Sequence, residues 1–435
     1  MIYKLNSIVW GAPLLILLLG TGLLISIRIK FFQIKKFGYI LKNTFFTLFR
    51  SKSPTESKDK DSISQFKAVS TALAAAMGTG NIVGVATALT IGGPGAIFWM
   101  WISAILGMSL VYAENYLGTI YRKKKNGVWY GGPMAYLEHG TGRRIPAICF
   151  AAFCCLASLG MGNMTQINSI SSVLNDSFGI NPLPIGIIGA IATAAVVSGG
   201  IKRIGTASQA IIPVLTLLYI SAALIITAIN YRSLPEVFGD IFKGAFGIAP
   251  VGGGISGALI SRSINTGLRR GVFSNEAGLG SCALLHSSAD GKDPKQLGMW
   301  AITEVFIDTI LCCTVTAVAI LSSGVMDCGK DGAPLVTEAF KSCFGNAAPY
   351  FITASIVLFA FATIIGWFHC GECSVRYLFG ETGIGFYKFI FTVFIVVGSV
   401  SKLEAVWAVS DIFNGLMAIP NLSGLIILRK KIKIE

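Results

Sequence analysis

Two glycine-rich segments of this sequence carry polar groups of the kind that bind a small charged ligand. The first is Ala75-Ala76-Met77-Gly78-Thr79-Gly80-Asn81, and the second is Gly271-Val272-Phe273-Ser274-Asn275-Glu276-Ala277-Gly278-Leu279-Gly280. Both lie in apolar surroundings, where glycine is a poor helix former. The amides and carbonyls left unpaired at an interrupted helix can bind a carboxylate and a cation. Glycine pairs more often serve close helix packing, but two breaks that also carry Thr, Asn, Ser and Glu favour a binding site.

Further polar side chains lie in other apolar stretches. Thr363 and Trp367 are four residues apart and therefore share one face of a helix. Gln166 lies in another apolar stretch, directly after Thr165. These three side chains add to the polar groups that the two breaks place in apolar surroundings.

Carboxylates within apolar stretches are functional candidates, because an ionised group is costly to keep in a membrane. Glu276, at the second break, fits either a cap on freed amides or a contact with substrate. Asp308 fits an ion path or gate, and also a structural partner of a buried arginine or of backbone. Arg262, Arg269 and Arg270 precede the second break and fit an outer gate or a place at the membrane interface.

The composition identifies the environment in which these groups must work. The chain has 435 residues, of which 53% are hydrophobic, 13% are charged and 50 are glycine, and its mean hydropathy is +0.70. Soluble proteins carry about 25% charged residues. This composition excludes a disordered chain, a secreted disulfide scaffold and an ordinary cytosolic enzyme. The net charge of +14 then indicates cytoplasmic loops that face an anionic lipid bilayer, with no nucleic acid as partner.

Eleven stretches are apolar enough to cross a bilayer as helices of about 20 residues. They cover residues 8–26, 66–89, 96–120, 147–174, 184–198, 207–229, 273–287, 298–322, 349–368, 386–400 and 405–428. We expect the first to be a retained helix with its N-terminus outside, because the positive charge follows it. The second glycine-rich break lies at the start of 273–287, which a long loop precedes.

The placement of basic residues predicts the orientation. With the N-terminus outside, the cytoplasmic segments are 28–67, 122–144, 202–203, 292–295, 376–388 and 429–433, and they hold 26 of the 35 Lys and Arg residues. Cytoplasmic loops carry such an excess of basic residues. An odd number of spans then leaves the C-terminus in the cytoplasm.

The two breaks are about five spans apart, in helices that run in opposite directions, as expected of an inverted repeat. The predicted organisation has four parts. Residues 1–64 form an extra N-terminal transmembrane helix, a cytoplasmic amphipathic segment and a polar linker. Residues 65–232 and 233–428 form two repeats of five helices each, and 429–435 form a cytoplasmic basic tail.

The ten cysteines do not form a disulfide framework. Most lie in predicted spans, where cysteine is usually a small apolar residue. Cys370 and Cys373 have redox spacing but lack the surrounding fold of a redox motif. Cys328 and Cys343 share a predicted outside loop in which a disulfide is permitted.

At these residues the sequence resembles the alanine or glycine:cation symporters, also called sodium:alanine symporters. The runs that carry the resemblance extend from about Phe66 to Gly424, and the most specific is Ser274-Asn275-Glu276-Ala277-Gly278-Leu279-Gly280. Others are Gly78-Thr79-Gly80-Asn81-Ile82-Val83-Gly84, Gly92-Gly93-Pro94-Gly95, Tyr112-Ala113-Glu114, Gly131-Gly132-Pro133-Met134 and Ile307-Asp308-Thr309.

The resemblance implies an all-α membrane protein with a leucine-transporter-type 5+5 inverted repeat and one extra helix. It implies a transporter of the cell membrane, not an enzyme, that couples sodium to uptake of a small neutral amino acid such as alanine or glycine. Sodium is the coupling ion, and no organic cofactor is implied. A proton-coupled amino-acid symporter is the alternative, in which Glu276 or Asp308 would carry the proton. Alanine against glycine, stereochemical preference and oligomeric state stay open.

The resemblance also implies which residues bind. The substrate-binding residues carried over are Gly78, Thr79, Gly80, Gln166, Phe273, Asn275, Thr363 and Trp367. Sodium is expected near Ala75, Ala76 and Thr363, which would offer two carbonyls and a hydroxyl.

Overall fold

The computed structural model describes residues 2–50, 63–125, 128–247, 253–290 and 293–434, and they are almost entirely helical. The N-terminal helices are α1 (Ile2–Val9), α2 (Ala12–Arg28), α3 (Phe32–Lys35), α4 (Phe37–Asn43) and α5 (Thr47–Arg50). The last three are the helical form of the predicted amphipathic segment, and most of the linker that follows lies outside the described residues.

The first half of the bundle contains one interrupted helix. It comprises α6 (Gln65–Ala76), η1 (Thr79–Asn81), α7 (Val83–Gly92), α8 (Gly95–Tyr121), α9 (Pro133–Ala135), η2 (Tyr136–Gly140), α10 (Arg144–Leu159), η3 (Gly160–Met164), α11 (Thr165–Phe178), α12 (Pro182–Val197) and α13 (Gly200–Ile229). Side chains cap the N-termini of two of these helices. Ser64 accepts from the Lys67 N–H at 3.2 Å at the start of α6, and Asn181 accepts from the Leu183 N–H at 3.0 Å at the start of α12.

The second half contains the other interrupted helix. It comprises η4 (Tyr231–Ser233), α14 (Leu234–Phe246), α15 (Gly253–Asn275), α16 (Ser281–Ser287), α17 (Pro294–Val305), η5 (Phe306–Cys313), α18 (Thr314–Ser322), η6 (Met326–Cys328), α19 (Gly332–Phe344), η7 (Gly345–Ala347), α20 (Ala348–Phe379), α21 (Thr382–Val400), α22 (Leu403–Leu428) and η8 (Arg429–Lys431).

Eight helical stretches of the described chain are long and apolar enough to cross a membrane. They are Lys4–Arg28, Gly95–Tyr121, Arg144–Phe178, Gly200–Ile229, Pro294–Ser322, Gly332–Phe379, Thr382–Val400 and Val406–Lys431. The predicted stretches 66–89 and 273–287 fall on the interrupted helices, and 184–198 falls on the shorter α12. The structure therefore supports a multi-pass helical membrane protein but does not itself fix the count at eleven.

One predicted boundary was wrong. The segment before residue 273 was expected to be a long loop, but it forms α14 and α15, and the second break follows a helix that begins at Gly253. The physical reason is composition, because α15 is rich in Gly, Ser, Arg and Asn and does not stand out as an apolar span. A second difference is a hairpin of β1 (Lys123–Lys125) and β2 (Val128–Tyr130), which pairs Lys123 with Tyr130.

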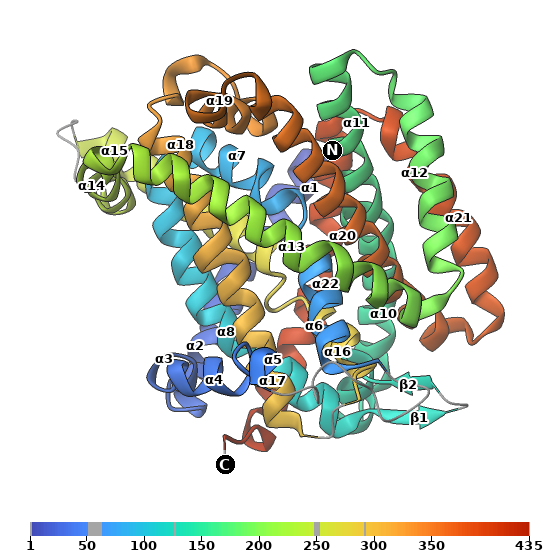
Figure 1. The fold of residues 1–435 in the computed structure, drawn as a ribbon. Coiled ribbons are helices and arrows are strands. Elements are labelled where there is room, and N and C mark those ends of the chain that lie inside the picture. Colours follow the sequence, from blue (N-terminus) through green and yellow to red (C-terminus); the bar gives the residue numbers. More distant parts are fainter. Residues whose placement is uncertain (1, 51–62, 126–127, 248–252, 291–292, 435) are drawn as a thin grey trace.

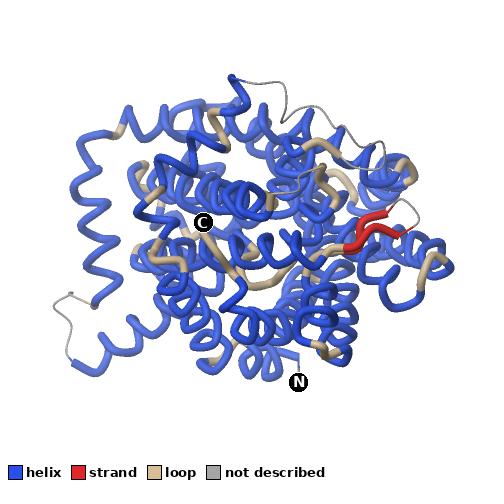
Figure 2. The backbone as a smooth tube through the Cα atoms, turned by 90° about the horizontal axis from the view of Figure 1, so that it is seen from below, coloured by secondary structure: helices blue, strands red, loops and turns tan. Residues whose placement is uncertain are grey.

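Several basic parts of the described chain lie at one end of the bundle, called the basic end below. Figure 1 shows α3 to α5, the hairpin and the C-terminus at this end, with α19 at the opposite end. Figure 2 views the bundle from the basic end and shows the hairpin at its rim. Cys328 and Cys343, which were candidates for a disulfide, are free thiols in the structure.

Candidate functional site

The two helix breaks lie where the sequence predicts them. Between α6 and α7 the chain passes through the single turn η1, and between α15 and α16 it runs through residues 276–280. Gly278 and Gly280 adopt φ values of 86° and 82°, a left-handed conformation that favours glycine. Glu276 is also left-handed, with φ of 56°, which is uncommon for a residue with a side chain.

The breaks meet each other in the protein interior. A methyl group added to Gly80 would lie 3.4 Å from the Ser274 Cα atom and 3.5 Å from the Phe273 ring. Thr79, Phe273 and Ser274 are all buried. The small size of residue 80 thus lets the first break lie against the end of α15.

Gln166 and Thr363 close around the first break from two other helices. The Thr79 N–H donates to the Gln166 side-chain oxygen at 3.3 Å. A methyl group at Gly78 would lie 2.6 Å from the Thr363 hydroxyl oxygen and 2.9 Å from the Gln166 side-chain oxygen. The structure therefore brings together Gly78, Thr79, Gln166 and Thr363, as predicted.

The residues expected near sodium are only partly grouped. The Thr363 hydroxyl donates to the Ala74 carbonyl at 2.8 Å and to the Phe359 carbonyl at 3.1 Å. Ala75 lies next to this pair, because a methyl group at Gly366 would lie 3.2 Å from its N atom. The Ala76 carbonyl instead accepts from the Gly78 N–H at 2.8 Å.

Glu276 is held by side chains rather than by freed amides. The Trp367 indole N–H donates to one carboxylate oxygen at 2.6 Å, and the Ser281 hydroxyl donates to the other at 2.5 Å. All three residues are buried. The bond from Trp367 attaches the second break to α20.

Asp308 accepts hydrogen bonds from both breaks. The Asn81 side-chain amide donates to it at 2.7 Å, and the Ser274 hydroxyl donates at 2.8 Å. Thr309 donates a third bond at 2.7 Å. Asp308 lies in the π-helical segment η5 (Phe306–Cys313), and such segments are frequent at functional sites. In the described residues, the side-chain oxygens of Asn81 and Thr79 are buried without a partner.

The side chain of Asn275 forms hydrogen bonds within the second break and with a neighbouring helix. Its side-chain oxygen accepts from the Ala277 N–H at 3.0 Å, and its amide donates to the Thr309 hydroxyl at 3.3 Å. It therefore lies beside the Asp308 cluster, with its polar atoms already paired.

An aromatic and cationic layer lies over Phe273. The Phe273 ring stacks on Trp407 with centroids 4.9 Å apart, and the Arg270 guanidinium lies 4.6 Å from the Trp407 ring centroid. The neighbouring Arg269 pairs with Asp411. This arrangement attaches the C-terminal end of α15 to α22 through both arginines.

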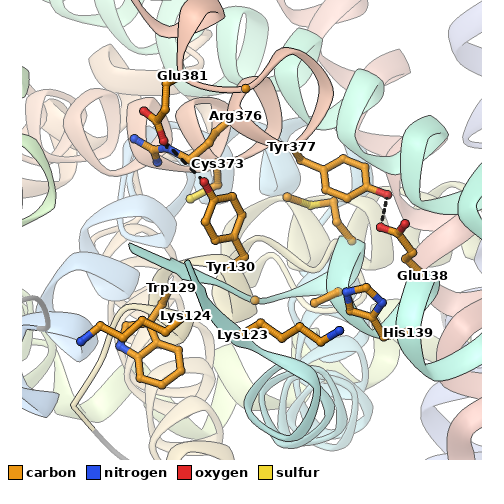
Figure 3. Close-up of a pocket in the computed structure, with 14 residues that line it drawn as sticks. Lys123, Lys124, Trp129, Tyr130, Glu138, His139, Cys373, Arg376, Tyr377 and Glu381 are labelled. Atoms are coloured by element: carbon orange, nitrogen blue, oxygen red, sulfur yellow. Dashed lines mark hydrogen bonds and ion pairs between the residues drawn. The ribbon is translucent and has the colours of Figure 1, made fainter. Parts of the chain in front are cut away.

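The site is closed in this structure. A cavity of about 10 Å³ lies between the second break and Asp308 and is lined by Ala72, Ala76, Val111, Asn275, Glu276, Cys282, Glu304, Val305 and Asp308. It has room for about one water molecule. A cavity of about 630 Å³ lies elsewhere, where the hairpin meets η2 and the end of α20. Figure 3 shows Tyr377 bonded to Glu138 there, and none of the predicted site residues lines that cavity.

Several residues of the site were missed as binding candidates. Asn81 and Ser274 lie inside the two predicted segments, and their polar side chains were the available signal. Trp407 could be noticed only as an aromatic residue in an apolar stretch. Asn421 donates to Glu114 at 2.6 Å and to the Gly278 carbonyl at 2.8 Å, which ties α22 to the second break; a polar side chain within an apolar stretch was its only signal.

Comparisons with known proteins agree with this geometry. Residues 1–435 match the sodium:alanine symporter family. The chain is 42% identical to the sodium/alanine symporter AgcS of Methanococcus maripaludis, over 98% of this chain and 94% of that protein. It is 36% identical to the probable sodium/glutamine symporter GlnT of Bacillus subtilis, over 98% of this chain and 87% of that protein.

Solved structures share the fold at low sequence identity. The crystal structure of MhsT in complex with L-phenylalanine matches with a TM-score of 0.58 at 15% identity, covering 82% of this chain and 88% of that one. The structure of Mhp1, a nucleobase-cation-symport-1 family transporter, matches with a TM-score of 0.55 at 15% identity, covering 88% and 83%.

Proposed function

The chain belongs to the sodium:alanine symporter family, and from this membership we propose that it couples sodium influx to uptake of alanine or glycine by alternating access. It is a secondary active amino-acid symporter of the cell membrane. The observation that carries the proposal is the meeting of two helix breaks in a buried, polar site. Such breaks bind substrate and coupling ion in secondary transporters.

The first break is the proposed site of the substrate carboxylate. Helix N-termini expose N–H groups that attract anions, and the Thr79 N–H now donates to the neutral side-chain oxygen of Gln166 at 3.3 Å. A substrate carboxylate would be the stronger acceptor. Gly78 and Gly80 allow close approach to the backbone, and the carbonyls of the second break, around Asn275, would accept from the substrate ammonium.

Trp367 and Phe273 are the proposed limits on side-chain size. Both are fully packed aromatic residues next to the second break. A methyl group at Gly162 would lie 2.2 Å from the Trp367 Cβ atom, so the backbone at Gly162 packs closely against Trp367. A wall of this kind admits hydrogen or methyl and disfavours larger side chains.

Two places are proposed for the coupling ion. The first is near Ala75, Ala76 and Thr363, where the Thr363 hydroxyl already donates to the carbonyl of the preceding α6 residue, Ala74, at 2.8 Å. The second is at Asp308, a buried carboxylate that already accepts hydrogen bonds from Asn81, Ser274 and Thr309. Hard cations prefer such oxygen ligands. Glu276 is proposed as a gate, because it ties the second break to Trp367.

We also propose the membrane arrangement. Eleven spanning helices, an outside N-terminus and a cytoplasmic C-terminus place the basic end in the cytoplasm, in accord with the positive-inside rule. Residues 65–232 and 233–428 would be the two repeats, after an extra helix within 1–64 and before a basic tail at 429–435. One break falls in each repeat.

Proton coupling is the alternative. Glu276 and Asp308 are both buried carboxylates at the second break or next to it, so either offers a place for a proton. Under this alternative, a pH gradient without sodium would drive amino-acid uptake.

Competition for labelled alanine uptake tests the proposed substrate class. In proteoliposomes with an inward sodium gradient, we expect unlabelled alanine and glycine to compete, and leucine and phenylalanine not to compete. The series should include D- and L-isomers. Competition by the large amino acids as strong as that by alanine would contradict a small, closed site.

The variant Trp367→Ala should widen this range. Removal of the indole opens the wall, so leucine should compete at least about tenfold better than in the wild type, a difference of ~1.4 kcal/mol. Trp367→Phe is the control, because it keeps an aromatic ring at the wall while it removes the bond to Glu276 and part of the indole volume. Unchanged selectivity in Trp367→Ala would remove this residue from the pocket wall.

A further inference from the structure

Three side chains with different metal-binding groups converge below the second break. Cys282 and His286 are one turn apart on α16, and Glu304 lies on α17. The His286 Nε2 atom is 2.7 Å from one Glu304 oxygen, and the Cys282 sulfur donates to the other at 3.2 Å. One ligand atom of each residue lies within 4.8 Å of the other two.

The cluster is buried, and one of its polar atoms is unused. His286 is 1% exposed and Glu304 is 4% exposed. Within the described chain, the Nδ1 atom of His286 is buried without a hydrogen-bond partner. Among the described residues, Glu304 forms an ion pair with His286 alone.

The ligand set selects a class of cation. Thiolate, imidazole and carboxylate together are typical of zinc, which binds them at about 2.0–2.3 Å. A cation between the three atoms would replace the protons that Cys282 and His286 now share with Glu304, since metal ligands must be deprotonated. Sodium and other hard cations would gain little from sulfur or imidazole.

The cluster is connected to the transport site. Cys282 and Glu304 line the same small cavity as Asn275, Glu276 and Asp308. On the other side of Cys282, the Asn115 side chain donates to the sulfur at 3.2 Å. A cation that reaches the cavity therefore reaches the cluster without crossing another helix.

We propose that Cys282, His286 and Glu304 form a binding site for a zinc-class divalent cation that holds α16 against α17 and so inhibits transport. The inhibition rests on the proposed function, because alternating access requires one helix group to move against the other. α16 continues directly from the second break, so a bond from α16 to α17 would restrain the break itself.

Binding is tested on the purified full-length protein without any transport. In equilibrium dialysis against Zn²⁺, the wild type should retain one ion per chain more than Cys282→Ser. Loss of an outer-shell partner weakens metal sites about 10–100-fold, so loss of a direct ligand should weaken zinc binding at least tenfold. The second variant, His286→Gln, should behave in the same way.

The matched control is Cys373→Ser. The Cys373 sulfur also contacts a buried histidine, His369, at 3.5 Å, but this pair lies outside the proposed site. Zinc binding retained in Cys373→Ser and lost in Cys282→Ser supports the assignment. Equal binding in Cys282→Ser and wild type overturns it, and so does a wild type that binds no zinc.

Transport gives the second readout. With zinc inside proteoliposomes, alanine uptake by the wild type should fall at least tenfold relative to zinc-free proteoliposomes. Uptake by Cys282→Ser should be the same with and without zinc. Zinc binding without inhibition would overturn the inhibitory role and leave the site standing. An absence of alanine uptake in zinc-free wild type would instead contradict the proposed function, and the dialysis result would be unaffected.

Discussion

Asp308→Asn should lose most sodium-driven alanine uptake while the protein remains folded. The substitution keeps the size of the side chain but removes the charge that accepts from Asn81 and Ser274, one residue from each break. Hydrogen bonds to a charged group contribute about 1.5–3 kcal/mol. We therefore expect uptake to fall on the order of a hundredfold, with a weaker apparent affinity for sodium.

The measurement is initial uptake as a function of sodium concentration. Asp327→Asn is the matched control, because Asp327 is an exposed carboxylate on the α19 side of the bundle and should behave like the wild type. A thermal unfolding profile close to that of the wild type would show that the fold is intact. Wild-type sodium dependence in Asp308→Asn would remove this carboxylate from the coupling mechanism.

Gly78→Ala should be nearly as damaging, for a steric reason. The added methyl group would lie 2.6 Å from the Thr363 hydroxyl oxygen and 2.9 Å from the Gln166 side-chain oxygen. Thr363 is anchored to the Ala74 carbonyl at 2.8 Å, so it cannot move without losing that bond. Overpacking costs about 1–3 kcal/mol, and uptake should fall on the order of ten- to hundredfold.

Gly84→Ala is the control for this variant. It also adds one methyl group to a glycine near the first break, but its nearest neighbour is the Thr79 carbonyl oxygen at 4.0 Å. Uptake by Gly84→Ala should stay within about twofold of the wild type, since no neighbouring atom lies close enough to the added methyl group to overpack this buried position. If both variants transport equally well, close packing at Gly78 is not needed for binding.

The two breaks were predictable from the sequence because their chemistry is local. Gly78, Gly80, Gly278 and Gly280 interrupt apolar stretches, and glycine has a strong local effect on a helix. Gln166 and Thr363 were also placed correctly beside the first break. Their position next to a segment far away in the sequence was implied by the family resemblance, because composition does not show which helices pack together.

The partners of the carboxylates were not predictable in the same way. For Glu276 the sequence left open a cap on amides or a contact with substrate, and it gave no sign of the bond from Trp367, which lies 91 residues away in the chain. Asp308 pairs with Asn81, 227 residues away. Such contacts depend on how helices pack and rotate, and hydropathy gives only the length of each helix.

Helices of polar composition were also difficult to predict from the sequence. α15 (Gly253–Asn275) was expected to be mostly loop, because its interior contains Gly, Ser, Arg and Asn. Tertiary packing overrides such weak local propensity. The residues that emerge on α15, Arg269 and Arg270, then gain their roles from Asp411 and Trp407 on α22.

The most direct test of the account is alanine accumulation by proteoliposomes under separate ion gradients. We predict accumulation under an inward sodium gradient at equal pH, and none under a pH gradient at equal sodium concentration. A dissipated sodium gradient should reduce the signal to equilibration. Accumulation driven by the pH gradient without sodium, or equal uptake with and without the sodium gradient, would contradict a sodium-coupled site at the two breaks.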